Sequence, residues 1–196
     1  MNRKDVLGII IAQSLVLIFI SFVWVSIKEE DVEFLNPPSF IYAEMFQKIS
    51  FSYDSLLKGF IAGIALLILS SLIIFLTPQL KKSLNILDEM LIGKLLPIDA
   101  LPIAIFSGIS EEIFFRGVLQ NSLGLIPASL IFALLHFPGK DFAIYALWTF
   151  FAGLLFGNLY EITQNIFIPI VAHIINNFIA ILIWKKFSLY WKVNDK

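Results

Sequence analysis

Residues 6–27 read VLGIIIAQSLVLIFISFVWVSI, a stretch that contains no charged residue. A helix of about 20 mainly apolar residues is long enough to cross the hydrocarbon core of a bilayer. Arg3 and Lys4 precede the stretch, as they would in a signal peptide, but the apolar run is too long and no small-residue cleavage site follows it. We therefore interpret residues 6–27 as an uncleaved first membrane span.

The whole chain has the composition of a membrane protein. Of its 196 residues, 59% are hydrophobic and 15% are charged, and its mean hydropathy is +0.88. Soluble domains usually contain about 45–50% apolar and about 25% charged residues. The absence of cysteine excludes disulfides and a zinc site made of cysteines. The net charge of −1 argues against nucleic acid as a partner, which normally calls for a basic patch.

The hydrophobic pattern predicts an all-α fold, a polytopic transmembrane bundle of about six spans in a single membrane domain, residues 1–196. The N-terminal part, residues 1–98, contains the first span and a second at residues 56–76. Between them we expect an acidic loop, with a short interfacial helix around residues 41–49. Leucines recur at helical spacing among charged residues near 79–96, which predicts an amphipathic helix on the membrane surface. The other spans are predicted at residues 99–121, 123–138, 142–160 and 165–187.

The basic residues predict the orientation of the bundle. If the N-terminus is cytoplasmic and the number of spans is even, nearly all lysines and arginines of the loops lie inside. Lys28, Lys48 and Lys58 then lie outside, near the acidic loop. We expect a multi-pass protein, with a bacterial cell membrane as its location and both termini in the cytoplasm.

A first motif, Ser110-Glu111-Glu112-Ile113-Phe114-Phe115-Arg116, places ionisable residues at membrane depth. Each such residue costs about 2.5–3.5 kcal/mol on insertion scales, so it indicates function unless shown otherwise. Glu112 and Arg116 are four residues apart and share a helical face, which predicts an ion pair. Glu111 is rotated by about 100° from that face and suits a general base. The alternative is a buried ionic network that only holds helices together.

The two histidines of the chain both lie in apolar surroundings, in the motifs Phe132-Ala133-Leu134-Leu135-His136 and His173-Ile174-Ile175-Asn176-Asn177. Taken alone, His136 is more typical of a satisfied interfacial residue. His173 and Asn177 share a helical face, and Pro169 one turn earlier loosens the backbone, which would open a polar cavity. Asn177 is suited to donate to a developing oxyanion, although interhelical hydrogen bonding is the alternative. Such a set activates water either directly or through a metal held by Glu and His.

The three motifs, in this order over about residues 99–180, resemble the CPBP family, the CAAX protease and bacteriocin-processing group, also called the Abi family. The family pattern is Glu-Glu-x-x-x-Arg, then Phe-x-x-x-His, then His-x-x-x-Asn or a similar small residue at the last position. The resemblance implies a glutamate-dependent intramembrane endopeptidase, in the class of metalloendopeptidases, whose substrate is a membrane-associated peptide or protein. The motif-bearing catalytic core would be residues 99–187.

The resemblance also assigns roles to the motif residues. Glu111 with His136 would position and deprotonate the attacking water, and Glu112 with Arg116 would support that geometry. Family members are classed as metalloproteases, yet the mechanism is also described without a metal. A divalent metal such as zinc, if one is used, would be held by Glu111, His136 and His173.

His173 and Asn177 would, by the same resemblance, stabilise the tetrahedral oxyanion. The competing interpretation is a non-catalytic membrane scaffold or a bacteriocin-immunity protein with a structural polar network. Straight spans would place Glu111 near the middle of the membrane, His136 near the cytoplasmic end and His173 in the outer half. Convergence of the site therefore requires a tilted, kinked or re-entrant helix, or span boundaries other than those predicted here.

Overall fold

The computed structural model describes residues 1–32 and 49–194, so residues 33–48 of the predicted acidic loop, and with them nearly all of the interfacial helix predicted around residues 41–49, lie outside the described part. The described residues contain helices and no strand, which confirms the all-α prediction. In chain order the elements are α1 (Arg3–Val32), α3 (Tyr53–Leu76), α4 (Pro78–Met90), η1 (Ile92–Lys94), η2 (Pro97–Asp99), α5 (Ala100–Glu112), the π-helix η3 (Ile113–Gln120), α6 (Asn121–Leu123), α7 (Leu125–Leu135), η4 (Lys140–Phe142), α8 (Ala143–Thr163) and α9 (Phe167–Asn194).

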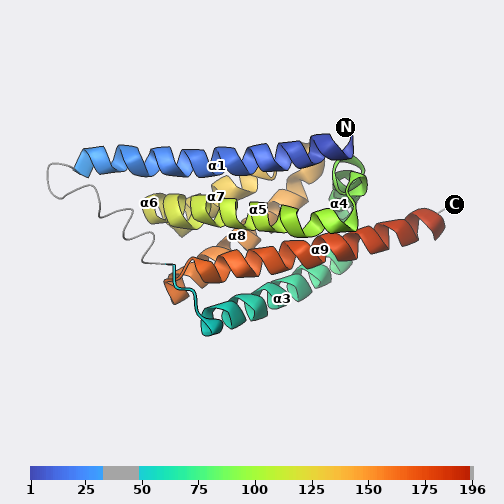
Figure 1. Ribbon diagram of the computed structural model, residues 1–196. Helices are drawn as coiled ribbons and strands as arrows, with labels where there is room; N and C mark the ends of the chain where they lie inside the picture. The colour runs from blue at the N-terminus through green and yellow to red at the C-terminus, as the bar shows by residue number, and fades with distance from the viewer. Residues whose placement is uncertain (33–48, 195–196) are drawn as a thin grey trace.

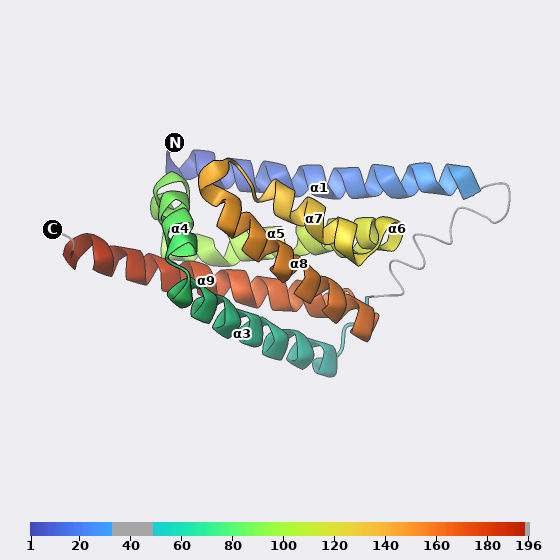
Figure 2. The ribbon, with the colours of Figure 1, turned by 180° about the vertical axis from the view of Figure 1, so that it is seen from behind.

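The long helices lie side by side as a bundle (Figures 1 and 2). Four segments within the described residues are long and apolar enough to cross a membrane: Arg3–Ile27, Tyr53–Leu76, Lys140–Thr163 and Phe167–Lys186. The unit α5–η3–α6 runs along the bundle without a break in its helical residues, and α7 is an apolar helix of 11 residues. The four apolar segments match the predicted spans 6–27, 56–76, 142–160 and 165–187. The α5–η3–α6 unit and α7 lie at the other two predicted spans, 99–121 and 123–138, but neither is among the four. Helix α7 by itself is only about 16 Å long, roughly half of a hydrocarbon core.

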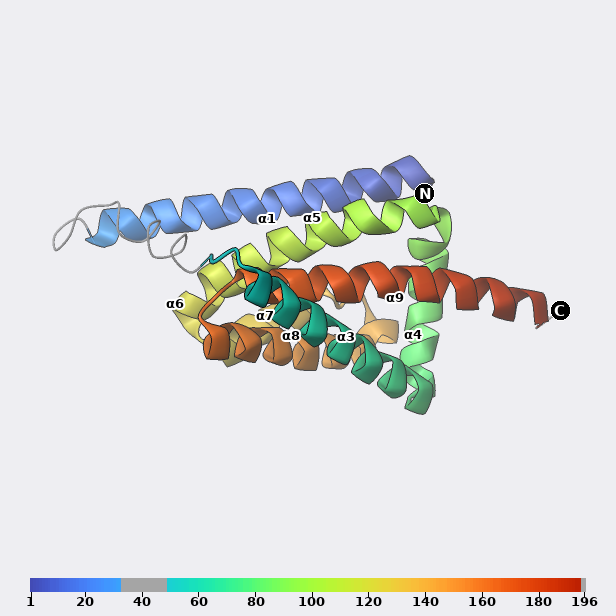
Figure 3. The same ribbon diagram turned by 60° about the horizontal axis from the view of Figure 1, so that its bottom comes forward.

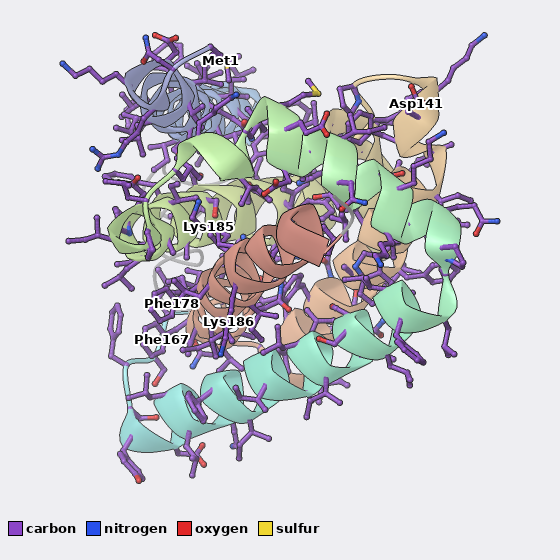
Figure 4. The ribbon with its side chains drawn as sticks, turned by 90° about the vertical axis from the view of Figure 1, so that its right-hand side faces the viewer. Met1, Asp141, Phe167, Phe178, Lys185 and Lys186 are labelled. Carbon is purple, nitrogen blue, oxygen red and sulfur yellow. The ribbon has the colours of Figure 1, made fainter. Side chains whose placement is uncertain are left out.

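Helix α4 crosses one end of the bundle, at a steep angle to the long helices (Figure 3). It buries Leu80, Ser83 and Asp88 and leaves most of its other residues exposed. The amphipathic helix predicted near 79–96 is therefore shorter than expected, because α4 ends at Met90 and a separate 3-10 turn, η1, follows it. Both chain termini lie at this same end (Figure 1), as an even number of passages demands. Figure 4 looks onto this end and shows Lys185 and Lys186 of α9 beneath α4.

Two glycines allow α3 to pack very closely on α9. A Cβ at Gly59 would lie 2.6 Å from Val171 Cβ, and one at Gly63 would lie 2.7 Å from the carbonyl oxygen of Ala172. Small residues four apart are the usual means by which membrane helices approach each other closely. The contact fixes the part of α9 that carries His173.

The start of α1 is tied to the start of α5 by a two-pronged ion pair. Arg3 donates from Nε to Asp99 Oδ2 over 2.8 Å and from Nη2 to Asp99 Oδ1 over 2.6 Å. The backbone N–H of Leu96 donates to the same carboxylate over 2.7 Å. The hydrogen bonds from Arg3 are the main reason that the pKa of the Asp99 carboxyl lies below its usual value.

Substitution of Gly63 by Ala tests the α3–α9 contact. The new methyl group would meet the backbone of Ala172, which cannot move aside as a flexible side chain can, so we expect a loss of about 1–3 kcal/mol in the free energy of unfolding. Unfolding of the purified protein in detergent measures the change. Gly8→Ala in α1 is the matched control, because its Cβ would meet nothing within 4 Å. Equal stability of the Gly63→Ala variant and the wild type would contradict close packing.

Substitution of Asp99 by Asn tests the tie between α1 and α5. Because the pKa of Asp99 is lowered on folding, its stabilisation is present above its ordinary pKa of 3.8 and is lost as the pH falls through the lower value of the folded protein. We expect the variant to unfold at a lower temperature than the wild type near pH 7, and the difference to shrink below pH 3.8. A difference that does not change with pH would assign the effect to packing instead.

Candidate active site

The first motif lies where α5 passes into the π-helix η3. Glu111 and Glu112 end α5, and Arg116 lies inside η3. Arg116 donates from Nε to Glu112 Oε2 over 3.0 Å, and both side chains are fully buried, which confirms the predicted pair. The guanidinium carbon of Arg116 lies 5.6 Å from the centre of the Phe132 ring and 5.9 Å from that of Phe115, so two aromatic rings lie close to the rest of its charge.

Glu112 also binds a histidine of α9, a contact that sequence reasoning did not predict. The distance from His173 Nδ1 to Glu112 Oε1 is 2.8 Å. Because this carboxylate already pairs with Arg116, it accepts from His173, and Nδ1 carries the proton. Phe156 of α8 stacks on the His173 ring at 4.7 Å between centroids and an interplanar angle of 13°. The ring is therefore fixed on one face and at one edge, and its Nε2 is turned toward Glu111.

Glu111 is buried but is not paired in the same way. Only 5% of the residue is exposed, and its Oε2 accepts no hydrogen bond from the described residues. This oxygen lies 3.9 Å from His173 Nε2 and 4.0 Å from His136 Nε2. Both separations exceed hydrogen-bond length but suit three groups that share one small ligand.

His136 reaches the site because α7 is short. The predicted span 123–138 is a helix only over Leu125–Leu135, so α7 ends within the bundle and not at its edge (Figure 2). His136 Nδ1 lies 2.7 Å from the carbonyl oxygen of Phe132, which can only accept, so this nitrogen carries the proton. The other ring nitrogen, Nε2, lies on the side of Glu111. The short helix accounts for the convergence that straight spans did not allow.

Asn177 lies one helical turn beyond His173 and contacts other polar groups. It donates from Nδ2 to Ser107 Oγ over 3.2 Å and accepts at Oδ1 from Asn176 Nδ2 over 3.2 Å. All of the predicted residues except Glu112 and Arg116 line one cavity of about 310 Å³. The cavity also takes in Leu84 and Leu87 of α4, so it extends from Glu111 toward the end of the bundle where the termini lie.

Among the residues of this cavity that the sequence analysis did not single out are Tyr145 and Asn176. The Tyr145 ring lies edge-on to His136, with 6.2 Å between centroids. Tyr145, Thr149 and Phe156 recur at helical spacing along α8 and all line the cavity, and this polar and aromatic stripe was a signal in the sequence. Asn176 falls at one of the unspecified positions of the His-x-x-x-Asn motif.

Another missed residue supports the π-helix. Asn121 donates from Nδ2 to the carbonyl oxygens of Arg116 and Gly117 over 3.0 and 2.9 Å, and it also bonds to the Tyr160 hydroxyl. A π-helical turn is rare and tends to occur at functional sites. Here Asn121 occupies carbonyls at the end of the turn that carries Arg116.

The positions of Glu111, His136 and His173 decide whether these side chains could bind a metal ion. Among the described residues, no group of three or more His, Cys, Asp or Glu side chains is placed so that it could hold a metal ion. Glu111, His136 and His173, the expected ligands, do converge, but at separations of 3.9 and 4.0 Å from the carboxylate oxygen. As placed, these side chains do not form a metal site.

Comparisons with known proteins point to this part of the chain. Residues 93–179, which include the whole Glu–His site, match the family described as type II CAAX prenyl endopeptidase Rce1-like, in agreement with the resemblance in the motifs. Over 66 residues the chain is 46% identical to "Uncharacterized protein YpbD" of Bacillus subtilis (strain 168), a match that covers 34% of this chain and 35% of that protein. No solved structure matches the chain.

The different pairing of the two glutamates predicts different effects on stability. Glu112→Gln removes the charge that balances Arg116, and breaking a buried pair in this way costs about 3–5 kcal/mol. Glu111→Gln is the matched control, since the oxygen it alters has no hydrogen-bond partner among the described residues. We expect a large loss of unfolding free energy for the first variant and little for the second, measured in detergent. Equal losses would contradict this division of roles.

Proposed function

We propose that the chain is an intramembrane endopeptidase similar to CAAX proteases, and that Glu111 activates the water that hydrolyses the peptide bond. The observation that carries the proposal is the position of Glu111 Oε2, buried and without a hydrogen bond, between the Nε2 atoms of His136 and His173. The similarity of residues 93–179 to a peptidase family supports the same reaction class.

Water between these groups would be held by all three. A carboxylate oxygen and two imidazole nitrogens about 4 Å apart can each contact one small molecule at hydrogen-bond length. Glu111 in its ionised form accepts a proton from that water, while His136 accepts a second hydrogen bond and orients it. The burial of Glu111 keeps bulk water away from the reacting atoms.

Hydrolysis then follows with all atoms accounted for. The water oxygen bonds to the carbonyl carbon of the scissile peptide, its proton passes to Glu111, and the carbonyl electron pair moves to oxygen. Collapse of this intermediate breaks the C–N bond, and the proton on Glu111 passes to the leaving amine. One water molecule has then been added across the bond, and Glu111 returns to its ionised state.

The oxyanion of the intermediate would be stabilised by His173 and Asn177. The second hydrogen on Asn177 Nδ2 is available after one is used on Ser107. Positive charge on the His173 ring would be supported by the Glu112 carboxylate, which in turn is held by Arg116. Such fixed donors are usually the largest contribution to acyl-transfer catalysis.

The surroundings of the site favour a substrate that is associated with the membrane. The cavity is lined mainly by residues of the long helices, several of which are apolar enough to cross a bilayer, and it leads toward the α4 end. We propose that this end faces the cytoplasm, in line with the distribution of lysines and arginines. A membrane-bound peptide or protein would then enter from the inner surface.

Expression of the wild type and of Glu111→Gln, side by side in a host that lacks this protein, tests the function. We expect the substitution to abolish cleavage, by about 10³-fold or more, because it keeps the shape of the side chain and removes the base. Mass spectrometry of membrane and secreted peptide termini should find termini that occur only with the wild type, and these would identify the substrates.

The abundance and monodispersity of both proteins in detergent serve as the control. Identical sets of termini, with both proteins folded and equally abundant, would contradict a peptidase. That result would favour a membrane scaffold or an immunity protein in which the buried Glu–Arg–His contacts are structural.

A further inference from the structure

Two residues that line the cavity carry a buried oxygen that accepts no hydrogen bond from the described residues: Glu111, through Oε2, and Asn176, through Oδ1. An unsatisfied buried acceptor is unfavourable and rare in native structures, so each case needs an explanation. For Glu111 the proposed function supplies one, the reacting water. Asn176 has no part in that reaction and is outside the family motif.

The orientation of Asn176 is set by a chain of side-chain hydrogen bonds. Asn177 donates to Ser107 Oγ over 3.2 Å, which turns Asn177 Oδ1 toward Asn176. Asn176 donates to that oxygen over 3.2 Å. The nitrogen of Asn176 is therefore engaged, and its oxygen is the end of the amide that remains for another donor.

Asn176 also lies on the face of α9 that lines the cavity. His173, Asn176 and Asn177 are at positions i, i+3 and i+4, which share one side of a helix, and all three line the cavity. Farther along the same side the cavity is lined by Ala180 and Trp184. A chain that enters from the α4 end would pass these residues, and then Asn176, before its scissile bond reached Glu111.

We propose that Asn176 is a substrate-binding residue, whose Oδ1 accepts a hydrogen bond from a backbone N–H of the peptide beside the scissile bond. A peptide in the cavity is a ligand that presents N–H and C=O groups in alternation. Asn177 would then meet the oxyanion while Asn176, next to it, meets an N–H of the same strand. This inference rests on the proposed function and adds to it a contact that holds the substrate in register.

The test combines a change in the protein with a change in the peptide. The probe is the peptide that spans a cleavage site found by the terminal mass spectrometry, bound to full-length Glu111→Gln protein in lipid nanodiscs so that it is not cut. One N–H at a time, on either side of the scissile bond, is replaced by an ester oxygen. We expect the ester substitution at one of these positions to weaken binding of the peptide about tenfold, which corresponds to the loss of one hydrogen bond.

Addition of Asn176→Leu to this protein should weaken binding of the unmodified peptide by a similar factor. In this variant the ester at that one position should change the affinity by less than about twofold. Such coupling between two changes isolates a direct contact. Asn176→Ala repeats the experiment with a smaller side chain, and thermal unfolding checks that both variants fold. Asn158→Leu, at an exposed asparagine of α8, is the matched control and should bind as the parent does.

Several outcomes would overturn the inference. Unchanged binding by Asn176→Leu, or ester effects that persist equally at every position in the variant, would assign Asn176 to the orientation of Asn177 alone. In that case the wild-type protein would still cleave its substrate, so only this inference would fail. Absence of any cleavage by the wild type would remove the proposed function and this inference together.

Discussion

The shared carboxylate of Glu112 is the interaction on which the site depends. It pairs with Arg116 on its own helix and with His173 on α9, and all three are almost or fully buried. An isolated charge at this depth costs several kcal/mol of free energy. Removal of one partner is therefore destabilising, because it leaves the remaining charge without compensation. The same carboxylate holds one nitrogen of His173 and thereby turns the other nitrogen toward Glu111. The Glu112 carboxylate thus both compensates the buried charge of Arg116 and orients the His173 ring.

Interruptions of regular helix geometry bring the other groups to this contact. Helix α7 stops after 11 residues, and the carbonyl of Phe132 in its last turn lacks a partner in the helix. His136 supplies that partner with its side chain, which both ends the helix and orients the ring. In the π-helix, Asn121 occupies the carbonyls of Arg116 and Gly117. In each case a polar side chain satisfies backbone that lipid could not solvate.

Local patterns gave the parts of this arrangement that could be predicted. The apolar stretches that became α1, α3, α8 and α9 were evident from length and composition, and the pair of Glu112 and Arg116 followed from helical spacing. The bond between Glu112 and His173 joins residues 61 apart, and no periodicity reports such a contact. The length of α7 was also overestimated, because Leu134, Leu135 and Phe137 continue the apolar pattern past the end of the helix.

The division between paired and unpaired groups bears on the choice between an enzyme and a scaffold. A network that only held helices together would gain by engaging every carboxylate, since each unpaired one is unfavourable. Here Glu112 is fully engaged, whereas Glu111 Oε2, buried beside it, faces two imidazole nitrogens at 3.9 and 4.0 Å and bonds to neither. The rings cannot close that distance freely, because the Nδ1 atom of each is held by Glu112 or by the Phe132 carbonyl. An arrangement that maintains such a separation favours a site for a small reacting molecule over a structural network.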